Sequence, residues 1–299
     1  MGQRCCCVPL AVTSNPMAVS ALLSQYQIHP SRALGQNFVT DPNTVRRVAR
    51  LSGVGPGDRV VEIGPGLGAL TVALADTGAQ VTAVEADRHV LVALRAVLAD
   101  SPRSLQVEVV HADAMKLDWG TLLGVAPGWV LVANLPYNIA TPLIANLLDT
   151  VPAIERMLVM VQREAGERLA ATVGSPGYGA VSVKVGYWAK AKVVASVPAS
   201  VFLPRPNVES VLVEIRRRAT PAVDAATAGP EEIFALVRAG FATRRKMLRR
   251  ALGPTVGTEV FHAAGVDPQA RAETLDVQAW GRLAGALRAS RVGGSLVDP

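Results

Sequence analysis

Short apolar, β-branched runs alternate with segments of helical periodicity through the first half of the chain. The runs are RVVEI (59–63), QVTAV (80–84), VEVV (107–110), WVLVA (129–133) and MLVMVQ (157–162), and the helical segments include GALTVALADTG, RHVLVALRAVLAD and PLIANLLDTV. Such runs are typical of strands buried on both faces. Because strands alternating with helices form a parallel, doubly wound sheet, we predict an α/β fold.

The pattern changes after residue 162. Two later runs, 191–198 and 209–217, have no long helix between them, which predicts an antiparallel hairpin at the sheet edge. The segment RRRATPAVDAATAGPEE indicates a linker, and Pro230 suits the start of a helix. Beyond it the pattern is helical only. We therefore predict a disordered N-terminal extension (1–23), an α/β domain (24–218) and a small helical domain (219–299).

Composition argues against several classes of protein. No apolar run approaches the roughly 20 residues that cross a bilayer. The only cysteines, Cys5, Cys6 and Cys7, are adjacent, so they offer neither a disulfide framework nor the spacing of metal ligands. MGQRCCCVPLAV lacks a convincing signal-peptide cleavage site, and translation could instead begin at Met17. We expect a cytoplasmic protein without a metal and without a membrane partner.

Charge is distributed unevenly. Residues 1–150 hold 10 basic against 11 acidic side chains, whereas residues 151–299 hold 20 against 13. This favours a surface for a polyanion in the second half of the chain, although dispersed arginines that only solubilise helices would give the same count.

A glycine-rich loop follows the first predicted strand. VVEIGPGLGALT places Gly64, Gly66 and Gly68 where glycine permits a sharp turn and close approach of a ligand. The spacing G-x-G-x-G differs from that of a dinucleotide-binding loop. Glu85 ends the second strand and could accept hydrogen bonds from ribose hydroxyls, while Asp113 follows the third and could accept one from an adenine amine. The alternatives are a glycine loop with only a packing role and acids that are merely solvated. The common position of the loop and both acids after successive strands favours an adenosine-type ligand.

The fourth strand ends in Asn134-Leu135-Pro136-Tyr137. The Asn134 side-chain oxygen and the Leu135 carbonyl could accept from the two N–H groups of an adenine amine and so localise its lone pair. Pro136 biases Leu135 toward an extended conformation, which aims that carbonyl outward. Tyr137 offers a ring on which an extruded base can stack. The alternative is a plain turn that caps a strand.

These motifs resemble a known family. QNF (36–38), EIGPGLGALT, VEAD, HADAM and NLPYNI are similar to motifs of class I, S-adenosylmethionine-dependent adenine N6-methyltransferases. More narrowly, the chain resembles the ribosomal RNA adenine dimethyltransferases of bacteria and their eukaryotic relatives. The resemblance continues through FLPRPNVESVLV (202–213), FATRRKMLRRAL (241–252) and RAETL (271–275) and covers roughly residues 25 to 290. The departures are the N-terminal extension and Val39, where the family commonly has Leu.

The resemblance implies a Rossmann-like, seven-stranded, mostly parallel sheet with an antiparallel edge hairpin, plus a small all-α C-terminal domain. It implies S-adenosylmethionine as cofactor and the 3′-terminal hairpin of small-subunit ribosomal RNA as substrate, where two adjacent adenosines become N6,N6-dimethyladenosine. A monomer that acts on immature small subunits is expected. The implied contacts are Asn37 and Val39 at the amino-acid end of the cofactor, the loop backbone at Gly64 and Gly66, Glu85 at the ribose, Asp113 at the adenine, and Asn134 at both methionine and target amine.

The RNA contact is predicted on FATRRKMLRRAL. In a helix at 100° per residue, Phe241, Leu248 and Leu252 fall within about 40° and form an apolar stripe. The basic side chains then lie away from the stripe or at its margin, and mutual repulsion among them favours a nearby polyanion over a merely solvated face. The predicted RNA contacts are Arg244, Arg245, Lys246, Arg249 and Arg250, with the VFLPRPN loop as the next candidate.

Three rival functions share part of this evidence. A large-subunit RNA methyltransferase that confers antibiotic resistance has similar catalytic motifs, but the long basic C-terminal region with RAETL favours the small subunit. A mainly non-catalytic factor for small-subunit assembly would also need an RNA surface. An NAD enzyme is disfavoured by both the loop spacing and NLPY.

Overall fold

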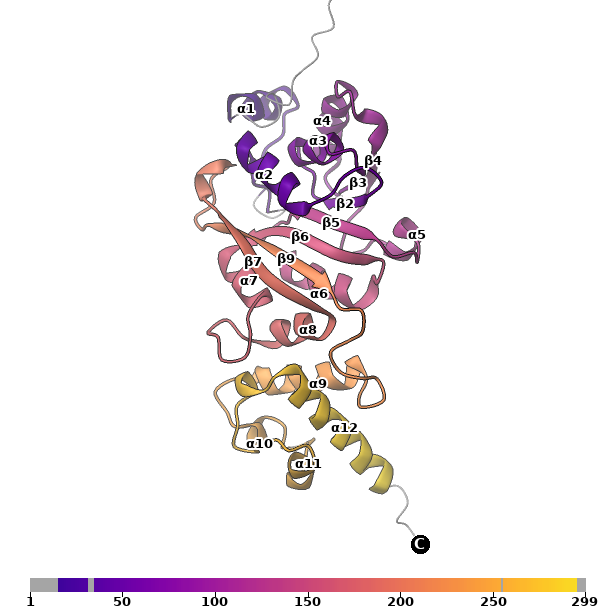
Figure 1. The fold of residues 1–299 in the computed structure, drawn as a ribbon. Helices are drawn as coiled ribbons and strands as arrows, with labels where there is room; N and C mark the ends of the chain where they lie inside the picture. The colour runs from indigo at the N-terminus through magenta and orange to yellow at the C-terminus, as the bar shows by residue number, and fades with distance from the viewer. Residues whose placement is uncertain (1–15, 32–34, 254, 295–299) are drawn as a thin grey trace, which may run out of the picture. The chain divides into compact units, whose positions relative to one another are not determined.

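The computed structural model describes residues 16–31, 35–253 and 255–294, and the chain divides into two compact units (Figure 1). Unit 1 comprises Met1–Gly166 and Lys192–Arg216, and unit 2 comprises Glu167–Ala191 and Arg217–Pro299. The predicted boundary at 218 is close to the last of these divisions. The segment 167–191 lies within the predicted α/β domain but groups with the helices of unit 2, because Tyr178, Val183 and Tyr187 are buried in the helical core.

Unit 1 is built on a mostly parallel sheet with the strand order β4-β3-β2-β5-β6-β9-β7. Neighbouring strands from β4 to β6 are parallel, and β9 is antiparallel to β6 with Ser210 opposite Gln162. This confirms the predicted fold class and the edge position of the two late strands. The strands are β2 (Arg59–Ile63), β3 (Gln80–Glu85), β4 (Val107–His111), β5 (Trp129–Asn134), β6 (Ile154–Gln162), β7 (Ala189–Val197) and β9 (Ser210–Arg217).

The central strands are buried on both faces, as their apolar sequences predict. Val60, Val61, Leu131 and Val132 have no accessible surface. Strand β4 is the exception, since its residues are only half-buried or exposed. The prediction that it is buried on both faces was wrong because β4 lies at the edge of the sheet and has a single neighbouring strand.

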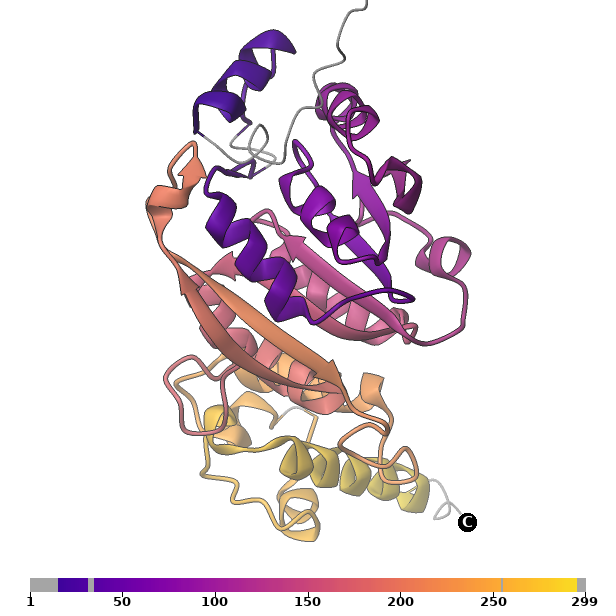
Figure 2. The ribbon, with the colours of Figure 1, turned by 45° about the horizontal axis from the view of Figure 1, so that its top comes forward.

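Helices lie on both faces of this sheet (Figure 2). Their termini follow local capping chemistry: the Asp41 carboxylate accepts from the first turn of α2 with Pro42 at its start, and Asp87 caps α4. The helices are α1 (Pro16–Gln25), α2 (Pro42–Ser52), α3 (Ala69–Asp76), α4 (Arg88–Ala99), α5 (Trp119–Leu123), α6 (Ala140–Thr150) and α7 (Arg163–Leu169). Short 3-10 turns η2 (Ser104–Gln106) and η3 (Ala199–Val201) and a two-stranded antiparallel ribbon, β1 (Phe38–Val39) with β8 (Phe202–Leu203), complete the unit.

Helix α1 corrects the prediction of a disordered extension. Residues 16–23 belong to this helix, and Val19 and Leu23 are buried in a cluster with Phe38, Leu67 and Val90. Apolar side chains at i and i+4 lie on one face of a helix, so the segment can bury them. The remainder of the predicted extension, 1–15, lies outside the described residues.

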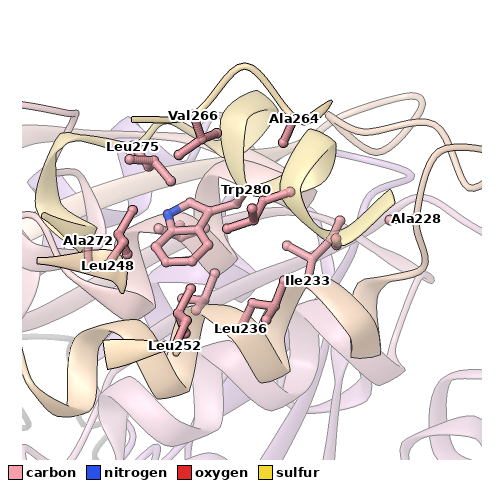
Figure 3. Close-up of a cluster of buried hydrophobic side chains, with 14 of the residues drawn as sticks. Ala228, Ile233, Leu236, Leu248, Leu252, Ala264, Val266, Ala272, Leu275 and Trp280 are labelled. Carbon is pink, nitrogen blue, oxygen red and sulfur yellow. The ribbon is translucent and has the colours of Figure 1, made fainter. Parts of the chain in front are cut away.

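Unit 2 is helical and surrounds one apolar core (Figure 3). Trp280 is fully buried at its centre, and the side chains of Leu248 and Leu252 point toward its indole. Gly240 allows this packing, because a Cβ there would lie 2.6 Å from the indole ring. The elements are α8 (Ala180–Trp188), α9 (Pro230–Ala242), α10 (Leu248–Ala251), α11 (Thr258–Ala263), η4 (Ala272–Thr274) and α12 (Val277–Gly294).

The basic segment 241–252 is not one continuous helix, contrary to the prediction. Helix α9 ends at Ala242, residues 243–247 form a turn, and α10 has only four residues. The backbone finds other partners here, since Leu248 N–H donates to the Ala270 carbonyl and Met247 pairs with Arg271 in an isolated bridge. Tertiary pairing has overridden the helical periodicity, although Leu248 and Leu252 are buried as expected.

Candidate functional site

A cavity of about 290 Å³ opens at the carboxyl ends of β2, β3 and β5 in unit 1. In parallel sheets this edge is where ligands bind. Most of its lining is apolar, including Phe38 and Val90, with a few polar groups between. The cavity brings together eight of the predicted site residues, which are Asn37, Val39, Gly64, Gly66, Glu85, Asp113, Asn134 and Pro136.

The glycine loop adopts the conformation that its sequence predicts. Gly64, Gly66 and Gly68 all have positive φ values, +70°, +56° and +84°. At Gly66 there is also no room for a side chain, because a Cβ would lie 3.1 Å from the ring of Phe38. Phe38 therefore packs directly against the loop, and Gly64 and Gly66 both line the cavity.

Glu85 lies at the end of β3 and is buried, with 8% of its surface accessible to solvent. Its Oε1 accepts from the Asp87 N–H at 2.9 Å, and its Oε2 accepts from the Gly66 N–H at 3.4 Å. Burial raises the pKa of this carboxyl, and the two backbone donors partly offset that effect. Each carboxylate oxygen can accept a further hydrogen bond from a ligand. Glu85 thus contacts the glycine loop through Gly66 and can also bind the predicted ribose.

Asp113 lies at the outer rim of the cavity. It is exposed, its Oδ1 accepts from the Met115 N–H at 2.9 Å, and its Oδ2 is 3.6 Å from the Lys116 ammonium. The carboxylate is thus oriented by its own turn, and it can accept a further hydrogen bond at the cavity mouth.

The QNF segment is fixed by hydrogen bonds to the strand ends. Gln36 Nε2 donates to Asp87 Oδ2 at 2.9 Å, while Asp87 Oδ1 caps α4 through the His89 N–H. Burial alone would raise the pKa of Asp87, but these donors outweigh burial and lower it. Sequence reasoning missed both Gln36 and Asp87 as site residues. The available signal was Asp87 at an N-cap position, directly before a helical pattern.

Asn134 has a defined amide orientation. Its Nδ2 lies 3.0 Å from the main-chain oxygen of Asn37, whose own Nδ2 donates to the Gly35 carbonyl at 3.1 Å. A carbonyl oxygen can only accept, so the atom of Asn134 that faces it must be the nitrogen. The Oδ1 atom of Asn134 is therefore turned away from Asn37 as an acceptor.

The rest of NLPY is pinned around this amide. Leu135 is buried and its N–H donates to the Met160 carbonyl at 3.0 Å. Pro136 packs so closely on Gly35 that a Cβ there would lie 3.0 Å from the proline Cβ. Tyr137 does not line the cavity but stands half-buried beside it, with its hydroxyl 2.8 Å from Ser210 Oγ. Burial raises the pKa of the Tyr137 phenol.

Glu62 is an acid in the cavity wall that sequence reasoning also missed. It is almost fully buried, and its Oε2 has no hydrogen-bond partner of good geometry among the described residues. Burial raises the pKa of its carboxyl to about 8, despite the opposing effect of the Thr71 hydroxyl, and the nearby charge of Glu85 adds to the rise. A neutral Glu62 at pH 7 follows from this environment.

The basic residues predicted to bind RNA all belong to unit 2. Arg244 is engaged: its Nε donates to Glu273 at 2.7 Å and its guanidinium also donates to the Pro176 carbonyl at 3.3 Å. The Met247–Arg271 bridge brings Arg271 beside the same turn. Sequence reasoning missed Arg271 as a possible RNA contact. Within the part of the chain that the structure describes, the following basic side chains are exposed and make no ion pair: Arg245, Lys246, Arg249, Arg250 and Arg271.

The family model and the similar curated proteins agree on one family. The family model for ribosomal RNA adenine dimethylase matches residues 29–288. The chain is 46% identical to the ribosomal RNA small subunit methyltransferase A of Streptomyces avermitilis over 276 residues, which cover 90% of this chain and 92% of that protein. The protein of the same name from Cutibacterium acnes is 43% identical over 293 residues, with 95% and 96% covered.

Two solved structures share the fold. The 23S rRNA methyltransferase ErmE superposes with a TM-score of 0.65 at 27% identity, covering 84% of this chain and 99% of that one. A dimethyladenosine transferase from Plasmodium falciparum superposes with a TM-score of 0.68 at 24% identity, covering 82% and 95%. The second likeness concerns the fold alone. Among the described residues, no helix is both long and apolar enough to cross a membrane.

Proposed function

The chain belongs to the ribosomal RNA adenine dimethylase family, and we propose that it transfers methyl groups from S-adenosylmethionine to the N6 amines of two adjacent adenosines in small-subunit ribosomal RNA. The product is N6,N6-dimethyladenosine in the 3′-terminal hairpin, made during ribosome biogenesis. The observation that carries the proposal is the acceptor Oδ1 of Asn134, fixed at the edge of a cavity suited to an adenosine.

The cavity fits S-adenosylmethionine. The glycine loop lines the cavity, the Glu85 carboxylate retains acceptor capacity, and a buried oxygen of Glu62 lacks a partner among the described residues. Glu85 is the residue for the ribose and Asp113 the residue for the adenine, with Asn37, Val39, Gly64 and Gly66 around the rest. When bound, this cofactor supplies an electrophilic methyl carbon on a sulfonium sulfur.

The residues of this chain act mainly by orientation. The lone pair of an adenine amine is delocalised into the ring, so Asn134 Oδ1 and the Leu135 carbonyl hold its N–H groups and turn the lone pair toward the cavity. Tyr137 presents a ring for the extruded base. Alignment of reactants alone can supply several kcal/mol of the barrier, and the surplus proton can leave to water. Leu135 and Pro136 act through the backbone, since the Leu135 side chain is buried.

The RNA contact is made by exposed basic side chains of the segment 241–252 in unit 2. Arg245, Lys246, Arg249 and Arg250 can neutralise phosphates, and Arg271 extends the same surface through its bridge to Met247. We assign Arg244 to holding the turn, because its guanidinium already binds Glu273 and Pro176. We therefore assign RNA binding to unit 2, and we expect the enzyme to act as a monomer in the cytoplasm.

One rival has a specific observation in its favour, the likeness to a 23S rRNA methyltransferase at 27% identity. Incubation of the purified protein with radiolabelled S-adenosylmethionine and either unmethylated small subunits or large-subunit RNA separates the two. We expect label in the small subunit only. Label in large-subunit RNA supports the rival, and binding of small subunits without any label supports an assembly factor.

A further inference from the structure

The hydroxyl of Tyr137 has one hydrogen bond to the described residues, the 2.8 Å contact with Ser210 Oγ. The two residues are 73 positions apart in the sequence. Tyr137 follows the end of a parallel strand, β5, whereas Ser210 is the first residue of β9. The contact therefore depends on how the late strand enters the sheet.

Strand direction explains the contact. Because β9 is antiparallel to β6, its first residue lies at the edge where β5 and β6 end, and the register places Ser210 opposite Gln162. The adjoining Arg163 N–H donates to the Glu209 carbonyl at 3.0 Å, which extends the pairing by one step. Ser210 is completely buried in this frame, so its hydroxyl has a fixed position.

The contact constrains the ring of Tyr137. Pro136 and the buried Leu135 fix the backbone before the tyrosine, but the side chain is only half-buried. A phenol held at its hydroxyl cannot swing about its first torsion without breaking that bond. Burial raises the pKa of this phenol above its ordinary value, which already lies above physiological pH.

We propose that Ser210 is a positioning residue for methyl transfer, which holds the Tyr137 ring at the angle where the target adenine stacks. This rests on the proposed function. No sequence motif assigns Ser210 a catalytic role, and its hydroxyl is hydrogen-bonded to Tyr137. A purely structural hydrogen bond is the alternative, and it would affect stability without a selective effect on turnover.

The test compares four variants with the wild type on unmethylated small subunits: Ser210→Ala, Ser210→Thr, Tyr137→Phe and the double change Ser210→Ala with Tyr137→Phe. We expect Ser210→Ala and Tyr137→Phe each to lower kcat by about tenfold, with the double variant no worse than either single variant because both remove one bond. Ser210→Thr keeps the hydroxyl and should recover most of kcat. The affinity for S-adenosylhomocysteine, measured by calorimetry, should change less than about twofold.

Ser52→Ala is the matched control, since Ser52 is also buried and its hydroxyl also makes one bond, 2.6 Å to the Ala49 carbonyl, away from the cavity. If Ser210→Ala has the kcat of Ser52→Ala, or if the two single losses multiply in the double variant, Ser210 has only a structural role. Absence of methylation by the wild type would instead remove the proposed function itself. Thermal unfolding of each variant checks that a lost kcat is not a lost fold.

Discussion

The side-chain nitrogen of Asn134 lies 3.0 Å from the main-chain oxygen of Asn37, 97 residues earlier in the chain. This contact joins two sequence motifs, QNF and NLPY, and fixes which end of the Asn134 amide faces the cavity. Asn37 therefore contributes through its backbone, and the substitution of its side chain would leave this bond in place. Together the two motifs orient one acceptor oxygen, Asn134 Oδ1, toward the cavity.

Asn134→Ala removes that acceptor. We expect kcat to fall by at least about a hundredfold, because orientation of the amine is lost and nothing replaces the oxygen. The free energy of unfolding should change by less than about 1 kcal/mol, as one hydrogen bond of a half-buried side chain is lost. Single-turnover methylation and urea unfolding measure the two quantities. Asn146→Ala, an exposed amide on α6, is the control, and equal turnover in both variants would reject the role of Asn134.

Glu85→Ala tests the cofactor site. Loss of hydrogen bonds to a charged group should weaken S-adenosylmethionine binding by ~1–3 kcal/mol. Glu85→Gln retains acceptor capacity at one oxygen and should lose less. Calorimetry gives both affinities. Glu108→Ala on the exposed side of β4 should bind as the wild type does, and an unchanged affinity in Glu85→Ala would require another ribose ligand.

Glu62 should make stability depend on pH. Its pKa is about 8 in the fold against an ordinary 4.5, so the folded chain binds its proton more tightly than the unfolded chain does. The resulting stabilisation is complete below about pH 4.5 and is lost as pH rises toward 8. Relative to Glu62→Gln, the wild-type free energy of unfolding should fall by several kcal/mol between pH 5 and pH 8.5, pH values chosen to span roughly these two pKa values. Parallel urea curves at all pH values would contradict a protonated Glu62.

Reversal of charge at Arg249 and Arg250 tests the RNA surface. Arg249→Glu with Arg250→Glu should weaken binding to small subunits and flatten its salt dependence, because fewer phosphate counterions are released. Affinity for S-adenosylmethionine should not change. Arg46→Glu with Arg47→Glu makes the same change of charge on exposed positions of α2 in unit 1 and should keep the wild-type salt slope. An equal loss in both pairs would point to net charge alone.

The sheet and the loop could be predicted because local sequence controls them. The apolar run 129–133 is buried as its sequence predicts, and the positive φ values at Gly64 and Gly66 favour glycine. The basic segment could not be predicted in the same way. Its helical period is real, but the pairing of Leu248 with Ala270 stabilises a turn that no local pattern records.

Ser210 and Gln36 were missed because their contacts join distant segments, whereas Glu62 was missed because of the strand in which it lies. Ser210 reaches Tyr137 only because β9 runs antiparallel to β6, and Gln36 reaches Asp87 across 51 residues. Glu62 lies inside a strand whose apolar sequence gives no sign that one acid faces a cavity. Glu85 and Asp113 could be predicted because both follow strands whose carboxyl ends lie at one edge of the sheet, where ligands bind.

The central claim is that Asn134 presents a target adenine amine for two successive methylations. The most direct measurement is mass spectrometry of nucleosides from unmethylated small subunits after incubation with S-adenosylmethionine and either the wild type or Asn134→Ala. We expect N6,N6-dimethyladenosine with the wild type and unmodified adenosine with the variant. Dimethyladenosine at the wild-type rate with Asn134→Ala, or no modified adenosine with the wild type, would contradict the account.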